Sequence, residues 1–177
     1  MIGGANANVL ALYHFYLQQD ISGTSPKLVI FAAGRPPYLQ NQPEDLSEGS
    51  VMAGKFLRKI ASVGFSPPEI LILSQNRNTQ DDMNKSLAVA HERGLNNLAF
   101  VTIAVQIRRA DAFLRKLLSE NQGWEGLNYT FISAEKILSG VDDRYRAAFQ
   151  DIEKTTPYRN NVYYETRGLI AFGDGKY

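Results

Sequence analysis

Residues 27–33 read KLVIFAA and lie between Ser25-Pro26 and Gly34. The stretch is short, apolar and partly β-branched, and breakers bound it on both sides, as is typical of a buried parallel strand. Three further runs of this kind follow at residues 69–73, 97–102 and 127–132. These four runs predict the strands of one sheet.

Apolar residues at helical spacing predict helices between and around these strands. We expect them over residues 8–19, 45–63, 80–93, from about 106, from 133, and over 142–154 and 161–172. Asp45 with Glu48, and Thr79 with Asp82, stand three residues apart as in a capping box. Strands that alternate with helices imply right-handed crossovers, and so a three-layer α/β domain whose mostly parallel sheet is covered by helices on both faces.

The composition indicates one domain over residues 1–177, with residues 134–177 as a helical C-terminal part. Hydrophobic residues make up 44% of the chain and the net charge is +1, so no overall field favours nucleic acid. The absence of cysteine excludes thiolate nucleophiles and sulfur-bound metals. With His14 and His91 as the only histidines, we predict no metal site.

The N-terminal sequence bears on location and on the first strand. No apolar stretch reaches the roughly 18 to 20 residues that span a bilayer, so we expect a cytoplasmic protein without membrane insertion. The chain opens with Met1-Ile2-Gly3-Gly4, a glycine turn with almost no strand ahead of it. The first strand is therefore either truncated in this sequence or supplied differently.

In open α/β sheets, ligands bind outside the C-terminal ends of the strands. That rule combines four loops, over residues 3–6, 34–37, 75–82 and 102–109, into one predicted site. The loop 75–82 is the most polar, because it places uncharged hydrogen-bonding side chains directly before a helix. Turn formation and helix capping explain the same residue types without a ligand, and both interpretations stay open.

Charged residues near this edge also have two interpretations. Arg108 and Arg109 fall in the first turn of a helix, where a positive charge opposes the helix dipole. An anionic ligand would compensate them, and so would an internal ion pair with one of four acids, namely Glu48, Asp81, Asp82 and Asp111. Arg35 lies on a loop stiffened by two prolines, which suits either binding or plain solvation.

The order of these motifs resembles the bacterial YdcF, SanA and ElyC family, a domain family of unknown function with a Rossmann-like fold. The resemblance rests on Gly3-Gly4, Ala33-Gly34, Ser47-Glu48, Asn78-Thr79-x-Asp81-Asp82, and Val101-Thr102 followed by Arg108-Arg109-Ala110. It implies that Glu48, Asn78, Thr79, Asp81, Thr102 and Arg109 line a pocket, and it associates the chain with envelope processes. The chain departs from the family pattern at Leu73, Asn76 and Gln106, where relatives often have Glu, Ser and His.

We therefore predict a site that binds a small anionic or nucleotide-like ligand, for which S-adenosylmethionine is one candidate. An alternative is an enzyme that acts on a phosphorylated or cell-envelope precursor substrate, with Glu48 or Asp81 as general base and Arg109 holding the anion. The predicted site comprises Gly3, Gly4, Asn6, Gly34, Arg35, Glu48, Gln75, Asn76, Asn78, Thr79, Asp81, Thr102, Gln106, Arg108 and Arg109.

A third hypothesis concerns the aromatic C-terminal part, which contains Tyr158, Tyr163, Tyr164 and Phe172. These side chains either pack on a partner or a second copy, giving a homo-oligomer, or cover the core of their own domain. Aromatic residues serve both purposes, so the sequence alone leaves the two hypotheses open.

Overall fold

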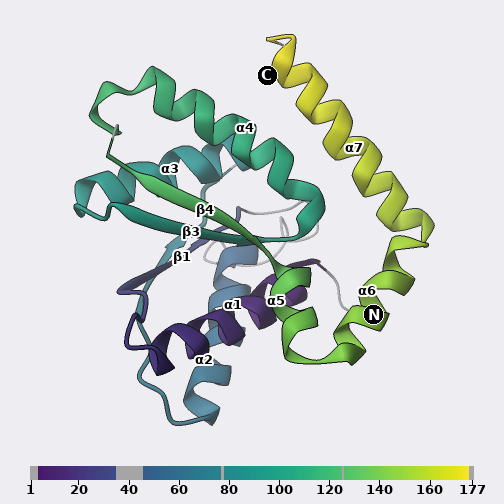
Figure 1. Cartoon of the computed structure of the whole chain (residues 1–177). Helices are drawn as coiled ribbons and strands as arrows, with labels where there is room; N and C mark the ends of the chain where they lie inside the picture. Colours follow the sequence, from purple (N-terminus) through teal and green to yellow (C-terminus); the bar gives the residue numbers. More distant parts are fainter. Residues whose placement is uncertain (1–3, 35–45, 77, 125, 176–177) are drawn as a thin grey trace.

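The computed structural model describes residues 4–34, 46–76, 78–124 and 126–175 (Figure 1). The strands are β1 (Leu28–Ala32), β2 (Glu69–Leu73), β3 (Asn97–Thr102) and β4 (Asn128–Ser133). The helices are α1 (Gly4–Ile21), α2 (Glu48–Ser62), α3 (Thr79–Glu92), α4 (Ala104–Glu120), the 3-10 helix η2 (Gln122–Trp124), α5 (Ala134–Val141), α6 (Asp143–Glu153) and α7 (Thr156–Gly173). The predicted α/β fold is confirmed.

All strand pairs are parallel, but they form two small sheets. β1 pairs with β2 from Leu28 opposite Glu69 onward, and β3 pairs with β4 from Asn97 opposite Asn128 onward. Among the described residues, β1 and β3 are not hydrogen-bonded to each other, so two two-stranded sheets stand where we predicted one mostly parallel sheet. The two sheets therefore face each other along the edges of β1 and β3.

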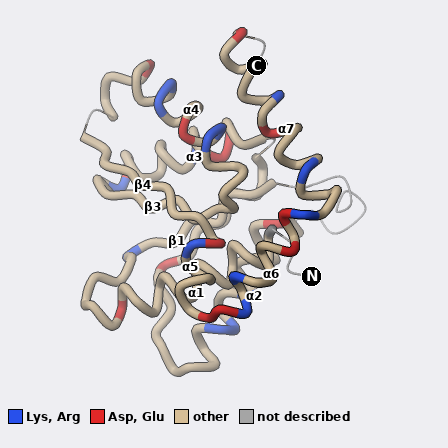
Figure 2. The backbone as a smooth tube through the Cα atoms, turned by 45° about the vertical axis from the view of Figure 1, so that its right-hand side comes forward, with Lys and Arg blue, Asp and Glu red and all other residues tan. Residues whose placement is uncertain are grey.

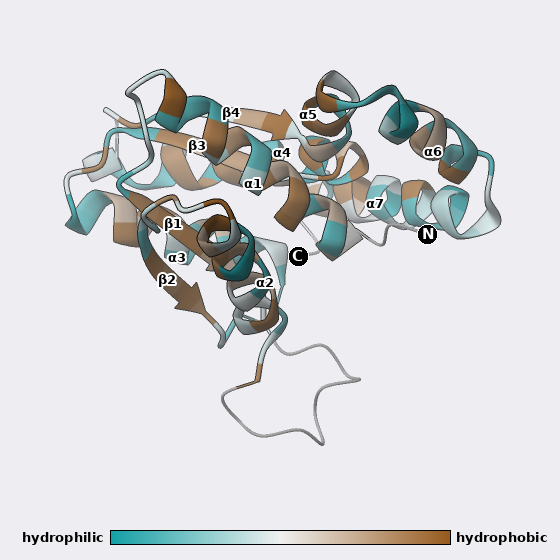
Figure 3. Ribbon diagram, turned by 90° about the horizontal axis from the view of Figure 1, so that it is seen from below, coloured by the Kyte–Doolittle hydropathy of each residue, from teal (hydrophilic) through white to brown (hydrophobic). Residues whose placement is uncertain are grey.

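Helices cover both faces of this arrangement. On one face, α1 and α2 pack on β1 through a cluster that includes Val9, Phe31 and Phe56. On the other face, α3 and α4 pack on β3 and β4 through Leu87 and Leu114. Figure 3 shows β1 and β2 as hydrophobic along most of their length, but only β1 has buried residues, Val29 and Phe31, whereas Ile72 of β2 is exposed.

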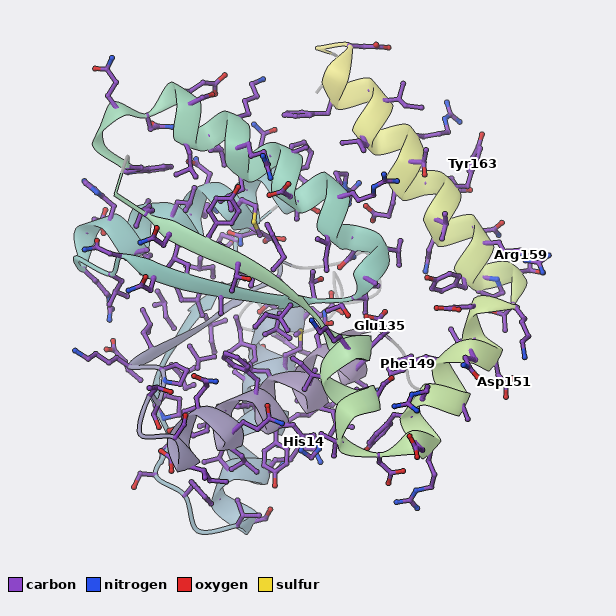
Figure 4. All side chains as sticks on the ribbon, viewed as in Figure 1. His14, Glu135, Phe149, Asp151, Arg159 and Tyr163 are labelled. Carbon is purple, nitrogen blue, oxygen red and sulfur yellow. The ribbon has the colours of Figure 1, made fainter. Side chains whose placement is uncertain are left out.

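The C-terminal helices extend this body on one side. α5 and α6 pack against α1 through Leu138 and Phe149, and α7 lies beside α4, where the rings of Phe113 and Phe172 meet edge to face at 4.5 Å between centroids. Part of the aromatic C-terminus thus covers its own domain. Tyr163 points away from the rest of the domain in Figure 4 and is 55% exposed.

Several helix starts differ from the predicted ones. α1 begins at Gly4 instead of residue 8, so Gly4 belongs to a helix and does not form a turn. Ser47 caps α2, because its hydroxyl accepts from the backbone N–H of Ser50 at 3.0 Å. The predicted cap Asp45 lies outside the described residues. A short hydroxyl side chain in extended backbone satisfies a helix N-terminus directly, which explains why α2 starts there.

Charge is distributed evenly over the described part of the chain. Figure 2 shows basic and acidic residues intermixed along the backbone, in keeping with the net charge of +1. Among the described residues, no helix has both the length and the apolar character needed to cross a membrane.

Candidate functional site

A cleft of about 950 Å³ separates the two small sheets. β1 and β3 line it along their full length, α1 closes one face, and α3 and α4 contribute to the other. Five polar residues of this cleft lie where the strands end, namely Glu48, Thr79, Asp82, Thr102 and Gln106, and other polar residues, among them Thr24, Lys27 and Asn96, lie at the opposite end. This is the edge at which ligands bind in parallel α/β folds.

Four residues of the predicted site meet in this cleft, although they come from separate segments. Glu48 opens α2, Thr79 opens α3, Thr102 ends β3, and Gln106 lies in the first turn of α4. The hydroxyl of Thr102 donates to the Oε1 atom of Gln106 at 2.7 Å. The parallel strands bring these side chains together because their C-terminal ends lie at the same edge.

Asp82 lies in the same cleft and is the most perturbed carboxyl group there. The Nδ2 atom of Asn76 donates to its Oδ1 atom at 2.6 Å. Burial raises the pKa of Asp82 to about 6 against the opposing effect of that hydrogen bond, and the charges of Asp81 and Glu48 raise it further. The group therefore exchanges its proton close to neutral pH, which suits acid–base chemistry.

Asn76 is 6% exposed and packs behind Asp82. Its Oδ1 atom is buried and has no hydrogen-bond partner among the described residues. A Cβ atom on Gly34 would stand 1.7 Å from the backbone oxygen of Asn76, so only glycine allows the β1 loop to approach this turn. Gly34 and Asn76 therefore contribute to the shape of the site from behind its surface.

Arg109 forms an internal ion pair with an acid that the sequence did not indicate. Its Nη2 atom donates to Oε1 of Glu165 at 3.0 Å and to the hydroxyl of Thr79 at 3.1 Å. Its Nε atom lies 2.9 Å from Oε2 of Glu165, and both side chains are less than 20% exposed. Of the acids proposed for this role, Asp111 pairs with Arg115.

The pair with Glu165 ties α7 to α4 beside the cleft. The pKa of Glu165 is raised, because burial outweighs the opposing effect of the nearby guanidinium of Arg109. No local sequence signal points to this contact, because Glu165 lies 56 residues from Arg109 along the chain. Asp82 had a signal, since it is the last residue of the polar loop 75–82, yet the predicted site residues included Asp81 and not Asp82.

Other predicted residues have structural roles. Asn78 caps α3, because its Oδ1 atom accepts from the N–H of Asp81 at 2.9 Å, so Thr79 is the first helical residue and the predicted cap is wrong. Gln75 is exposed, and its carbonyl oxygen accepts from Lys85 at 3.0 Å. Thus the dense polar loop is used mainly for capping and turn formation.

The remaining predicted residues are not brought into the cleft. Asn6 is exposed and accepts from Lys55 at 2.6 Å, in a groove between α1 and α2. Arg108 is exposed on α4, and Gly4 starts α1. Gly3 and Arg35 lie outside the described residues. Over the described ranges, no group of three or more His, Cys, Asp or Glu residues is placed to hold a metal ion.

The comparisons with known proteins add no relative to this picture. No family model matches the chain, and neither a curated protein nor a solved structure does so. The resemblance to the YdcF, SanA and ElyC family therefore stays a prediction from the motifs.

Proposed function

We propose that the chain binds a small nucleotide-like ligand, with an anionic group, at the strand ends of the cleft. The observation that carries this proposal is the convergence of Glu48, Thr79, Asp82, Thr102 and Gln106 on one cavity. These side chains offer acceptors for sugar hydroxyl and amino groups, and the Thr79 hydroxyl is in contact with the guanidinium of Arg109. An adenosyl compound such as S-adenosylmethionine fits this combination.

Fold and family belong to the same proposal. A Rossmann-like arrangement, as in the YdcF, SanA and ElyC family, would place a ligand at this edge. The internal pairing of Arg109 with Glu165 leaves its guanidinium in contact with the Thr79 hydroxyl, but the carboxylate compensates its charge, so Arg109 is not a free anion-binding group. We therefore assign recognition chiefly to the polar side chains in the cleft.

A thermal-shift screen with ATP, S-adenosylmethionine and sugar phosphates tests this function. A ligand at 100 times its Kd adds about 2.7 kcal/mol to the free energy of unfolding, so a binder should raise the Tm clearly. The double variant Thr79→Val, Gln106→Leu should remove the shift, whereas Asn6→Ala, outside the cleft, should retain it. A shift of equal size in the cleft variant would contradict the assignment.

Asp82 favours a second function, an enzyme that acts on a phosphorylated or envelope-precursor substrate. A carboxyl group with a pKa of about 6 in a cleft can donate a proton to a leaving oxygen near neutral pH. This moves the role of acid or base from Glu48 or Asp81, which we predicted, to Asp82. Turnover of p-nitrophenyl phosphate or a sugar phosphate should fall at least about 100-fold in Asp82→Asn. An unchanged rate would refute this role.

A further inference from the structure

We propose that the cleft between β1 and β3 is the seat of one apolar β-strand, which runs parallel to both strands and leads directly into α1. This inference uses the same cleft as the proposed ligand site but a different part of it. It concerns the cleft along the strands, whereas the ligand site concerns the polar residues at the strand ends.

The first argument is the unpaired edge of β1. The oxygen of Lys27 accepts from the N–H of Glu69 at 3.3 Å, so the backbone groups of Lys27 face β2. Because these groups alternate in direction along a strand, those of Leu28, Ile30 and Ala32 point away from β2, into the cleft.

β3 presents a matching edge. The oxygen of Asn96 accepts from the N–H of Asn128 at 2.8 Å, so the groups of Asn97, Ala99 and Val101 face the cleft by the same alternation. Within the described ranges, neither set of groups makes a backbone hydrogen bond. Two edges that face one cavity leave donors and acceptors that a single strand would satisfy on both of its sides.

The second argument is the lining of the two faces. One face of α1 points into the cleft at helical spacing, through Ala5, Asn8, Leu12, Phe15 and Gln19. Opposite, α3 and α4 contribute Met83, Ser86 and Ala110. The lining is predominantly apolar, and the Oδ1 atom of Asn8 is buried without a described partner. An occupant enclosed in this way needs apolar side chains on both faces.

The third argument is connectivity, and it identifies the source of the strand. Each of β1, β2, β3 and β4 is followed by a helix, α2, α3, α4 and α5 respectively, that starts at the C-terminal edge of the strands. α1 starts at that edge too, beside α5, and runs back along the layer of α2 (Figure 1). No described strand precedes it. A parallel strand in the cleft would end beside the start of α1, as a covalently continuous βα unit requires.

The proposed strand has defined properties. To match β1 and β3 it needs five or six residues, about 16 to 20 Å of extended chain. It should be rich in Val, Ile and Leu and lack proline, which cannot donate to a sheet. With it in place, the order would be β2, β1, new strand, β3, β4 in one parallel sheet.

The test compares the 177-residue chain with a chain extended ahead of Met1 by Val-Ile-Val-Val-Leu-Val. The extension should raise the Tm by at least about 5 °C. It should also slow amide hydrogen exchange at least tenfold in residues 28–32 and 97–102. An extension with proline at its second and fourth positions is the matched control, and it should produce neither effect.

Three results would overturn the proposal. The first is an extended chain without added protection in residues 28–32 and 97–102, and the second is equal protection by the proline control. The third is a dimer of the unextended chain, measured by light scattering, in which these segments are already protected, because a second copy would then fill the cleft. If the extended chain is insoluble, the free acetylated peptide is titrated into the 177-residue chain. Slower hydrogen exchange confined to residues 28–32 and 97–102 then supports the proposed strand, and unchanged exchange there overturns it.

Discussion

Replacing Asp82 by asparagine should stabilise the protein above pH 6 and leave its stability nearly unchanged near pH 4. The carboxyl group of Asp82 keeps its proton in the folded protein up to a pH of about 6, because burial raises its pKa from 3.8 to about 6. In the unfolded chain the proton leaves near pH 4. The folded state thus binds more protons between these values, and stability falls as the pH rises through this window.

The size of the effect follows from the shift. About two pKa units at 1.36 kcal/mol each give about 3 kcal/mol of stability that the wild type loses between pH 4 and pH 7. Asparagine cannot ionise, and its side-chain oxygen can still accept from Asn76 as Asp82 does. The variant should therefore avoid the loss while it retains the hydrogen bond.

Urea unfolding of both proteins at half-unit steps from pH 4 to pH 8 measures this difference. The gap in the free energy of unfolding should widen with pH by about 3 kcal/mol and level off above pH 7. Asp143→Asn is the matched control, because it makes the same change at an exposed carboxylate of α6 that pairs with Arg146, away from the cleft. Parallel curves for wild type and Asp82→Asn would refute the reasoning.

Two further substitutions test the walls of the site. Arg109→Met should lower the free energy of unfolding by about 3 to 5 kcal/mol, because it leaves Glu165 buried without its partner. It should also speed proteolysis of α7, and an unchanged rate of proteolysis would contradict a role of this ion pair in holding α7 against α4. Gly34→Ala should lower the free energy of unfolding by about 1 to 3 kcal/mol or more, since its Cβ atom would meet Asn76. Gly140→Ala, with open space around it in α5, should instead stabilise by up to about 1 kcal/mol in the same urea titration.

The strands were the most predictable part of the chain. The run 27–33 contains β1, and the runs 69–73 and 97–102 coincide with β2 and β3. The run 127–132 starts and ends one residue before β4. Apolar runs bounded by glycine or proline carry enough local information for this. Parallel pairing also followed, because strands joined through helices have to return in the same direction.

Helix starts and buried contacts were less predictable, because they depend on competition and on tertiary structure. Ser47 and Asp45 are both good caps, and so are Asn78 and Thr79. In each pair, the backbone geometry decides which residue caps the N-terminus of the helix. The ion pair of Arg109 with Glu165 joins α4 to α7, and the sequence held no sign that these helices would be neighbours.

The division of the sheet shows why strand prediction and sheet prediction are separate problems. Every strand can be recognised from its own residues, but whether β1 and β3 belong to one sheet depends on what lies between them, and no described strand lies there. Asp82, Thr79 and Thr102 lie at the end of that opening, so a strand there would form the floor of the proposed ligand site. The two proposals nevertheless fail separately. Hydrogen exchange in residues 28–32 and 97–102 reports on the strand, whereas the ligand-induced Tm shift and its loss in the Thr79 and Gln106 double variant report on the site.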